Sequence, residues 1–225
     1  MAPAQRAAVA EFTGTAALLS VVVGSGIMAE RLAGGNAAIA LLANALATGF
    51  ALYVLITVLA PVSDAHLNPV VTLAAVVNGE LRPRTAVVYL AMQWSGAVVG
   101  VWLAHAMFDV AVFQVGVKVR TGFGQWLSEV VATMGLVLTI AGCARHAVSQ
   151  IAVAVGAYIA AAYRFTDSTS FANPAVTTAR ALTDTFAGIR PLDAPAFMAS
   201  QVAGMLLGLL LARMLMPKRE GRENN

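Results

Sequence analysis

Long apolar runs alternate with short polar segments along most of this chain. Six of the runs are long enough to cross a bilayer, since a membrane-spanning helix needs roughly 20 mostly apolar residues. The runs cover residues 10–32, 37–60, 84–108, 126–144, 147–163 and 195–216. The pattern therefore predicts an all-α integral membrane protein in which residues 1–225 form a single membrane domain, with a polar tail at 217–225.

Two intervening stretches, at about 62–82 and 165–190, are too polar and too interrupted to cross a membrane. They contain "HLNPVVTLA" and "FANPAVTTA", which share the pattern Asn-Pro-x-Val-Thr. Asn is a good helix N-cap, and Pro is favoured at the first helical position. We therefore expect a short half-helix to begin at each pair. The pairs are Asn68-Pro69 and Asn173-Pro174.

Further sequence motifs that occur once in each half indicate that the chain contains an internal repeat. The pattern Glu-x-x-small-Thr opens an apolar run at Glu11 and again at Glu129, and Gln-x-x-Gly-x-x-x-Gly begins at Gln93 and again at Gln201. Each half contains three spans, an odd number, so the halves insert with opposite topology. This predicts an inverted repeat with the glycine pairs at close helix crossings. Its two halves are residues 8–108 and 126–216.

The re-entrant segments predict a pore. Irregular backbone is tolerated at membrane depth only where protein buries it or water wets it. Two half-helices that enter from opposite faces meet N-terminus to N-terminus, and their dipoles place partial positive charge at the centre, beside the Asn amides. Such a pore repels cations and protons and passes neutral molecules that form hydrogen bonds. We expect a passive channel for small neutral solutes.

Charge and cysteine content narrow the class of protein further. The formal charge of +3 comes from basic residues beside the spans, where they set orientation and do not indicate nucleic-acid binding. With six spans, Arg6, Arg82, Arg84 and Arg145 share one side with the basic tail, so both termini are expected in the cytoplasm. The lone Cys143 excludes an intrachain disulfide.

Two other classes of membrane protein were weighed. A secondary transporter also uses inverted repeats and broken helices. The ionisable candidates for a proton relay within the runs are Glu11 and Glu129, and the two occupy matched positions in the two halves. An intramembrane enzyme has less support, because HExxH, GxSxG and paired Cys and His are missing. We expect neither enzymatic activity nor a metal or other cofactor.

The paired motifs resemble those of the aquaporin (major intrinsic protein) family over nearly the whole chain. The resemblance implies six transmembrane helices plus two re-entrant half-helices, a homotetramer in membrane lipid, and loop-bracing roles for Glu11 and Glu129. It also implies a central constriction in which Val70 replaces the family's usual alanine in the first box. The constriction comprises Asn68, Pro69, Val70, Asn173, Pro174 and Ala175.

The resemblance also predicts a selectivity filter, and here the sequence departs from the family. The family usually has Arg three residues after the second Asn, where this chain has Val176. Counting back 20 residues from the first Asn gives Thr48, and counting back 12 from the second gives Ala161, with Ser170 completing the ring. The expected aromatic and arginine side chains are both missing. The filter should therefore be wider and less polar than that of a water channel.

Two polar residues near the motifs have open roles. Arg180, one helical turn beyond Val176, either leans back toward the pore, or else snorkels to the interface or binds loop carbonyls. His66 is adjacent to the pore, either as a pH-sensitive group or as a hydrogen-bonding side chain.

Val176, together with "STSFANPAVT" and "TDTFAGI", resembles a bacterial aquaglyceroporin branch linked to arsenic resistance. The resemblance implies a location in the bacterial inner membrane and passage of As(OH)3, with methylarsenite and glycerol as further candidates. The residues themselves do not separate these solutes from one another. A plain water channel and an inverted-repeat secondary transporter remain as alternatives.

Overall fold

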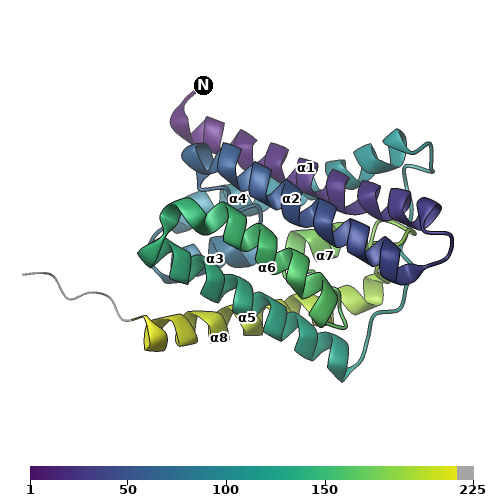
Figure 1. The fold of residues 1–225 in the computed structure, drawn as a ribbon. Coiled ribbons are helices and arrows are strands. Elements are labelled where there is room, and N and C mark those ends of the chain that lie inside the picture. The colour runs from purple at the N-terminus through teal and green to yellow at the C-terminus, as the bar shows by residue number, and fades with distance from the viewer. Residues whose placement is uncertain (217–225) are drawn as a thin grey trace, which may run out of the picture.

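The computed structural model describes residues 1–216, and the predicted polar tail at 217–225 lies outside the described residues. The described part is built from α-helices, as Figure 1 shows. The helices are α1 (Pro3–Leu32), α2 (Ala37–Ser63), α3 (Pro69–Val77), α4 (Pro83–Met107), α5 (Phe123–His146), α6 (Ile151–Phe165), α7 (Pro174–Arg180) and α8 (Ala194–Leu215). Short 3-10 turns at Val148–Gln150 and Pro191–Asp193 precede α6 and α8.

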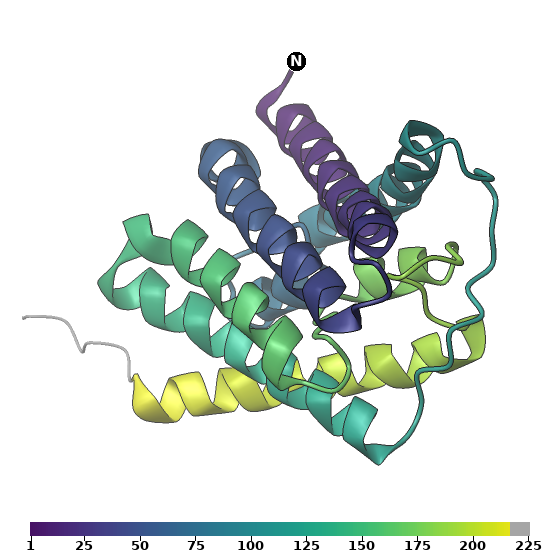
Figure 2. The same ribbon diagram turned by 45° about the vertical axis from the view of Figure 1, so that its right-hand side comes forward.

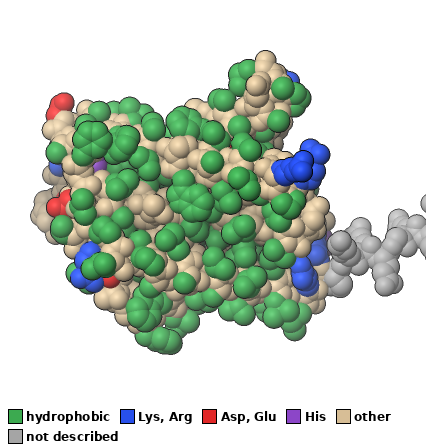
Figure 3. All heavy atoms as spheres, turned by 180° about the vertical axis from the view of Figure 1, so that it is seen from behind, with side chains coloured by type: hydrophobic (Ala, Val, Ile, Leu, Met, Phe, Trp, Pro, Cys, Tyr) green, Lys and Arg blue, Asp and Glu red, His purple; other side chains and the backbone are tan. Residues whose placement is uncertain are grey.

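The predicted spans and half-helices are confirmed within the described residues. Six helices there are long and apolar enough to cross a membrane, and α3 and α7 are the two short helices that follow the Asn-Pro pairs. Many large apolar side chains point outward from the long helices, and the space-filling view in Figure 3 shows them covering one face of the bundle. An apolar exterior of this kind suits contact with lipid.

The helices pack as two groups that meet in the middle. Helix α1 packs against α2 and α4, helix α5 packs against α6 and α8, and α2 packs against α6 (Figures 1 and 2). The predicted glycine crossings are confirmed, because a Cβ at Gly96 or Gly100 would clash with the α1 backbone, and one at Gly204 or Gly208 with α5. Helices α2 and α6 also cross closely where Gly49 meets Gly156, a contact that our sequence analysis missed.

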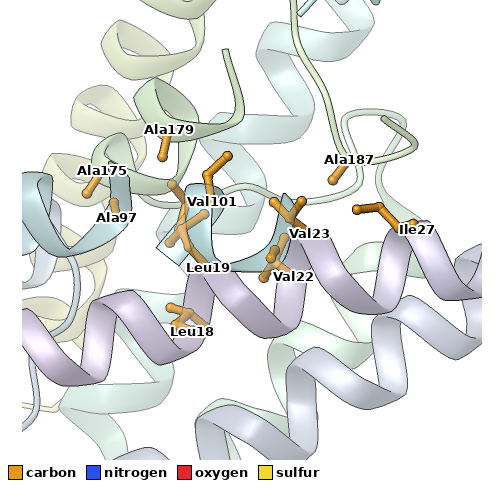
Figure 4. Packing of buried hydrophobic residues seen from close by; sticks show 12 residues of the cluster. Leu18, Leu19, Val22, Val23, Ile27, Ala97, Val101, Ala175, Ala179 and Ala187 are labelled. Carbon is orange, nitrogen blue, oxygen red and sulfur yellow. The ribbon is translucent and has the colours of Figure 1, made fainter. Parts of the chain in front are cut away.

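A buried apolar cluster anchors the half-helix α7. Figure 4 shows side chains of α1, α4 and α7 packed together, with Leu19, Val23 and Val101 fully buried. Small residues on α7, Ala175 and Ala179, allow it to lie close to its neighbours. Because dense packing leaves a short helix little freedom, the first residues of α7 are held at a fixed place in the bundle.

The segment 108–122, which links α4 to α5, runs along one end of the bundle (Figure 2). The amide of Gly116 donates a hydrogen bond to the carbonyl of Ala181 at 2.9 Å, and the amide of Arg190 donates to the carbonyl of Lys118 at 2.8 Å. This segment is therefore hydrogen-bonded to the residues that follow α7. We call this end the loop end. The opposite end, where α8 stops at Leu215, is the tail end.

Candidate channel lumen

The two Asn-Pro pairs start the half-helices. The Asn68 Oδ1 accepts a hydrogen bond from the Val70 amide at 3.0 Å, so it caps α3. The Asn173 Oδ1 caps α7 by accepting from the amides of Ala175 at 3.0 Å and Val176 at 3.2 Å. In each helix the first residue is the Pro, whose missing N–H needs no partner there. The predicted helix starts are confirmed.

The same two asparagines tie the half-helices together. The Asn68 Nδ2 donates to the carbonyl of Ala172 at 2.8 Å, and the Asn173 Nδ2 donates to the carbonyl of Leu67 at 2.9 Å. Each carbonyl belongs to the residue just before the other asparagine. The half-helices therefore meet N-terminus to N-terminus, and each amide keeps a second hydrogen that can face a solute.

Glu11 and Glu129 hold the re-entrant loops from within α1 and α5. Both carboxylates are fully buried, and each accepts four hydrogen bonds. Glu11 accepts from the Ser63 Oγ, the His66 and Leu67 amides and the Gln93 Nε2. Glu129 accepts from the Ser168 Oγ, the Phe171 and Ala172 amides and the Gln201 Nε2. The contacts support the bracing role that the repeated motif predicts.

The braced loops have an unusual backbone that is the same in both halves. Three residues of each loop have positive φ angles of 46° to 61°, a region that residues other than glycine seldom adopt. They are Asp64, Ala65 and Leu67 in the first loop and Thr169, Ser170 and Ala172 in the second. Such strain persists only where the surroundings fix it, and here the buried carboxylates do so.

A cavity of about 800 Å³ passes between the two halves. Both asparagines line it, together with residues of α2, α5, α6 and α8, which makes it the candidate lumen. Of the other residues predicted for the central constriction, Pro69, Val70, Pro174 and Ala175 are buried and lie behind the asparagines. Val70 packs instead against Val137, Met205 and Leu209, so its extra bulk does not narrow the lumen.

Three of the four predicted filter residues line the cavity. Thr48, Ser170 and Val176 do so from α2, the second loop and α7. The Ser170 Oγ is buried and has no hydrogen-bond partner among the described residues. The structure therefore brings these three residues together.

Ala161 is the exception, because it is exposed and does not line the cavity. Tyr163 lines the cavity from the same helix, and its hydroxyl lies 3.5 Å from the Thr48 Oγ1. Two residues correspond to about 200° around an α-helix. A count along the sequence that is wrong by two residues therefore selects a side chain on the opposite face of the helix. The spacing of Val155, Ile159 and Tyr163, all on the lining face of α6, could have identified Tyr163 as a residue that lines the cavity.

Arg180 does not line the cavity. Its side chain is fully buried, its Nε donates to the carbonyl of Ala187, and its guanidinium stacks over the ring of Phe171. Of the two roles considered, the structure shows the contact with a loop carbonyl. His66 does line the cavity, and its Nδ1 lies 3.1 Å from the Thr72 Oγ1.

Comparison with known proteins agrees with this geometry. Residues 1–147 match the family described as major intrinsic protein. The chain belongs to the major intrinsic protein family. It is 49% identical to the aquaglyceroporin AqpS of Rhizobium meliloti (strain 1021) over 211 residues, which cover 94% of this chain and 90% of that protein. It is 35% identical to the probable aquaporin TIP1-1 of Oryza sativa subsp. japonica over 142 residues, 61% of this chain and 56% of that one.

Among solved structures, the X-ray structure of the aquaglyceroporin from Plasmodium falciparum has the same fold, with a TM-score of 0.68 and 21% identity. The match covers 94% of this chain and 95% of that one. The family and the fold make the chain a multi-pass membrane protein that acts as a passive channel for small solutes, and not an enzyme.

Proposed function

We propose that this member of the major intrinsic protein family is an aquaglyceroporin-type channel whose permeants are trivalent arsenic, as As(OH)3 or methylarsenite, and glycerol. The observation that carries the proposal is Val176, which lines the cavity where the family usually places an arginine. At the loop end of the lumen, the described lining side chains of α2, α6, the second loop and α7 carry no charge.

The chemistry of the lining suits a neutral polyhydroxy solute. The hydroxyls of Thr48 and Tyr163 offer hydrogen bonds, while Val176 and Leu52 present apolar surface. Sites for small molecules commonly combine a mostly apolar wall with a few placed polar groups. The lack of a guanidinium at position 176 leaves room there for a molecule broader than water. The name and 49% identity of the Rhizobium meliloti relative also support the aquaglyceroporin class.

The proposal includes an arrangement in the membrane. We place the inverted repeats at residues 8–108 and 126–216, related by an axis in the membrane plane. Basic side chains gather beside the tail end in Figure 3, whereas the loop end shows both acidic and basic ones. Since cytoplasmic loops carry an excess of Lys and Arg, this supports cytoplasmic termini in a bacterial inner membrane. We propose a homotetramer surrounded by lipid.

One experiment ranks the candidate solutes. Purified protein is reconstituted into liposomes, and permeability to water, glycerol and urea is measured by stopped-flow light scattering, with arsenite uptake measured directly on the same preparation. The proposal expects non-saturating flux of glycerol and arsenite well above that of protein-free liposomes. Flux of water alone would identify a plain water channel. Flux that saturates at modest concentration or follows an ion gradient would identify a secondary transporter.

A further inference from the structure

Two buried guanidinium groups flank one aromatic ring in the wall of the lumen. The Cζ of Arg180 lies 3.4 Å from the centroid of the Phe171 ring, and the Cζ of Arg120 lies 5.1 Å from it. The two arginines are 1% and 6% exposed, and Phe171 lines the cavity. Arg120 comes from the 108–122 segment and Arg180 from the end of α7. Neither lines the lumen, but both face a ring that does.

Backbone carbonyls hold these guanidiniums without neutralising them. Arg180 donates from its Nε to Ala187, while Arg120 donates from its Nε to Gly188 at 2.9 Å and from its Nη1 to Ser168 at 3.2 Å. Within residues 1–216, neither arginine has a carboxylate within ion-pair distance. The Arg180 Nη1 is buried and has no hydrogen-bond partner in the part of the chain that the structure describes.

Both groups are expected to stay charged. Burial lowers the pKa of Arg120 from its ordinary value, but a guanidinium remains protonated at neutral pH. The wall at the loop end therefore contains two positive charges.

The mirrored half of the protein has no such pair. His66 stands in the first loop where Phe171 stands in the second, 105 positions later. The buried carboxyl group beside the first loop is that of Glu11, and among the described residues no buried arginine accompanies it. Beside the second loop, Arg120 and Arg180 are buried together with the carboxylates of Glu129 and Asp193, and Asp193 is paired with Arg190 at 2.8 Å. Among the described residues, buried guanidinium groups therefore stand beside the second loop and not beside the first.

We propose that Arg180 and Arg120 form an electrostatic filter that keeps protons and metal cations out of the lumen by acting through the ring of Phe171. A charge set behind the wall repels a cation because the interior screens it weakly. A neutral solute feels the same charge only through its dipole, and the lumen keeps its width because the guanidiniums do not enter it. Charge selection is thus separated from size selection. The inference rests on the proposed function, since it assigns a second kind of selectivity to the same lumen.

The test compares charge-removing variants in liposomes. Arg180→Met and Arg120→Met each replace a buried guanidinium by a flexible apolar side chain. Arg164→Met is the matched control, because Arg164 is exposed at the end of α6 and donates to the carbonyl of Ala38 away from the lumen. For each protein, proton leak under an imposed potential and urea permeability are measured on one preparation, with assembly checked by size-exclusion chromatography. We expect the ratio of proton to urea permeability to rise at least tenfold in both test variants and to stay at the wild-type value in Arg164→Met.

A further variant separates charge from packing. Arg180→Lys keeps the positive charge but loses the planar group that stacks on Phe171, so its ratio should stay close to that of the wild type. A Lys variant that leaks as much as Arg180→Met would overturn the inference, as would unchanged ratios in both Met variants. If Arg180→Met does not assemble, Arg120→Met decides by the same criterion. Wild-type protein without urea or glycerol flux would instead overturn the proposed function itself.

Discussion

The hydroxyls of Thr48 and Tyr163 lie 3.5 Å apart, on helices from opposite halves of the chain. The two helices approach closely because Gly49 faces Gly156, where any side chain would clash with the opposing backbone. This crossing places both hydroxyls on the wall of the lumen. A contact between α2 and α6 therefore brings these two hydroxyls together on the wall of the lumen.

Replacing Tyr163 with Phe should lower glycerol permeability. The variant loses one hydroxyl from the wall, and a single hydrogen bond contributes about 1 kcal/mol, which corresponds to roughly a fivefold change. The measurement is glycerol flux relative to water flux in liposomes. Ala161→Val is the control, because Ala161 is exposed and lies away from the lumen. A larger effect from Ala161→Val than from Tyr163→Phe would favour the filter position counted from the sequence.

Replacing Val176 with Arg should narrow the lumen. The neighbouring hydroxyl-bearing side chains are small apart from Tyr163, and a guanidinium spans several ångströms of a pore only slightly wider than its solute. Arsenite and glycerol permeability should fall by at least about tenfold more than water permeability. Val176→Leu adds bulk without a charge and should change the ratio less. An unchanged arsenite-to-water ratio in an assembled Arg variant would mean that residue 176 does not face the narrowest part.

Asn173→Asp should admit cations or abolish neutral flux. The Asp carboxylate keeps an oxygen that can cap α7. Its second oxygen takes the place of the Nδ2 that donates to the Leu67 carbonyl, so two hydrogen-bond acceptors face each other there. Its negative charge also cancels the positive ends of the half-helix dipoles. Potassium conductance and urea flux are measured together, with the mirrored Asn68→Asp as a companion variant. Normal urea flux without cation leak would contradict the central position of this residue.

Glu129→Gln should destabilise the protein more than it changes selectivity. The carboxylate accepts four hydrogen bonds, and an amide offers one acceptor oxygen and turns two donors toward the same partners. The expected loss is about 2 to 3 kcal/mol of unfolding free energy, measured by denaturant titration in detergent. Glu30→Gln, at an exposed position of α1, should have little effect. A Glu129→Gln variant as stable as the wild type would argue against the bracing role.

The sequence by itself determined the helices and where the half-helices begin. Apolar runs of sufficient length specify spans because the bilayer has a fixed thickness, and Asn followed by Pro starts a helix through contacts within three residues. The resemblance of the repeated Glu11 and Glu129 motifs to those of the family also implied the braces. All of these depend on local chemistry or on the solvent, so a linear pattern can carry them.

Only the tertiary structure decided which side chains meet at the lumen. The choice of Tyr163 over Ala161 depends on the rotation of α6 against α2, which is set by the contact of Gly49 with Gly156. The position of Arg180 behind Phe171 likewise depends on where the carbonyl of Ala187 lies after α7 ends. A spacing counted along the chain does not fix the rotation of a helix, because a change of two residues in the adjoining loop turns it by about 200°.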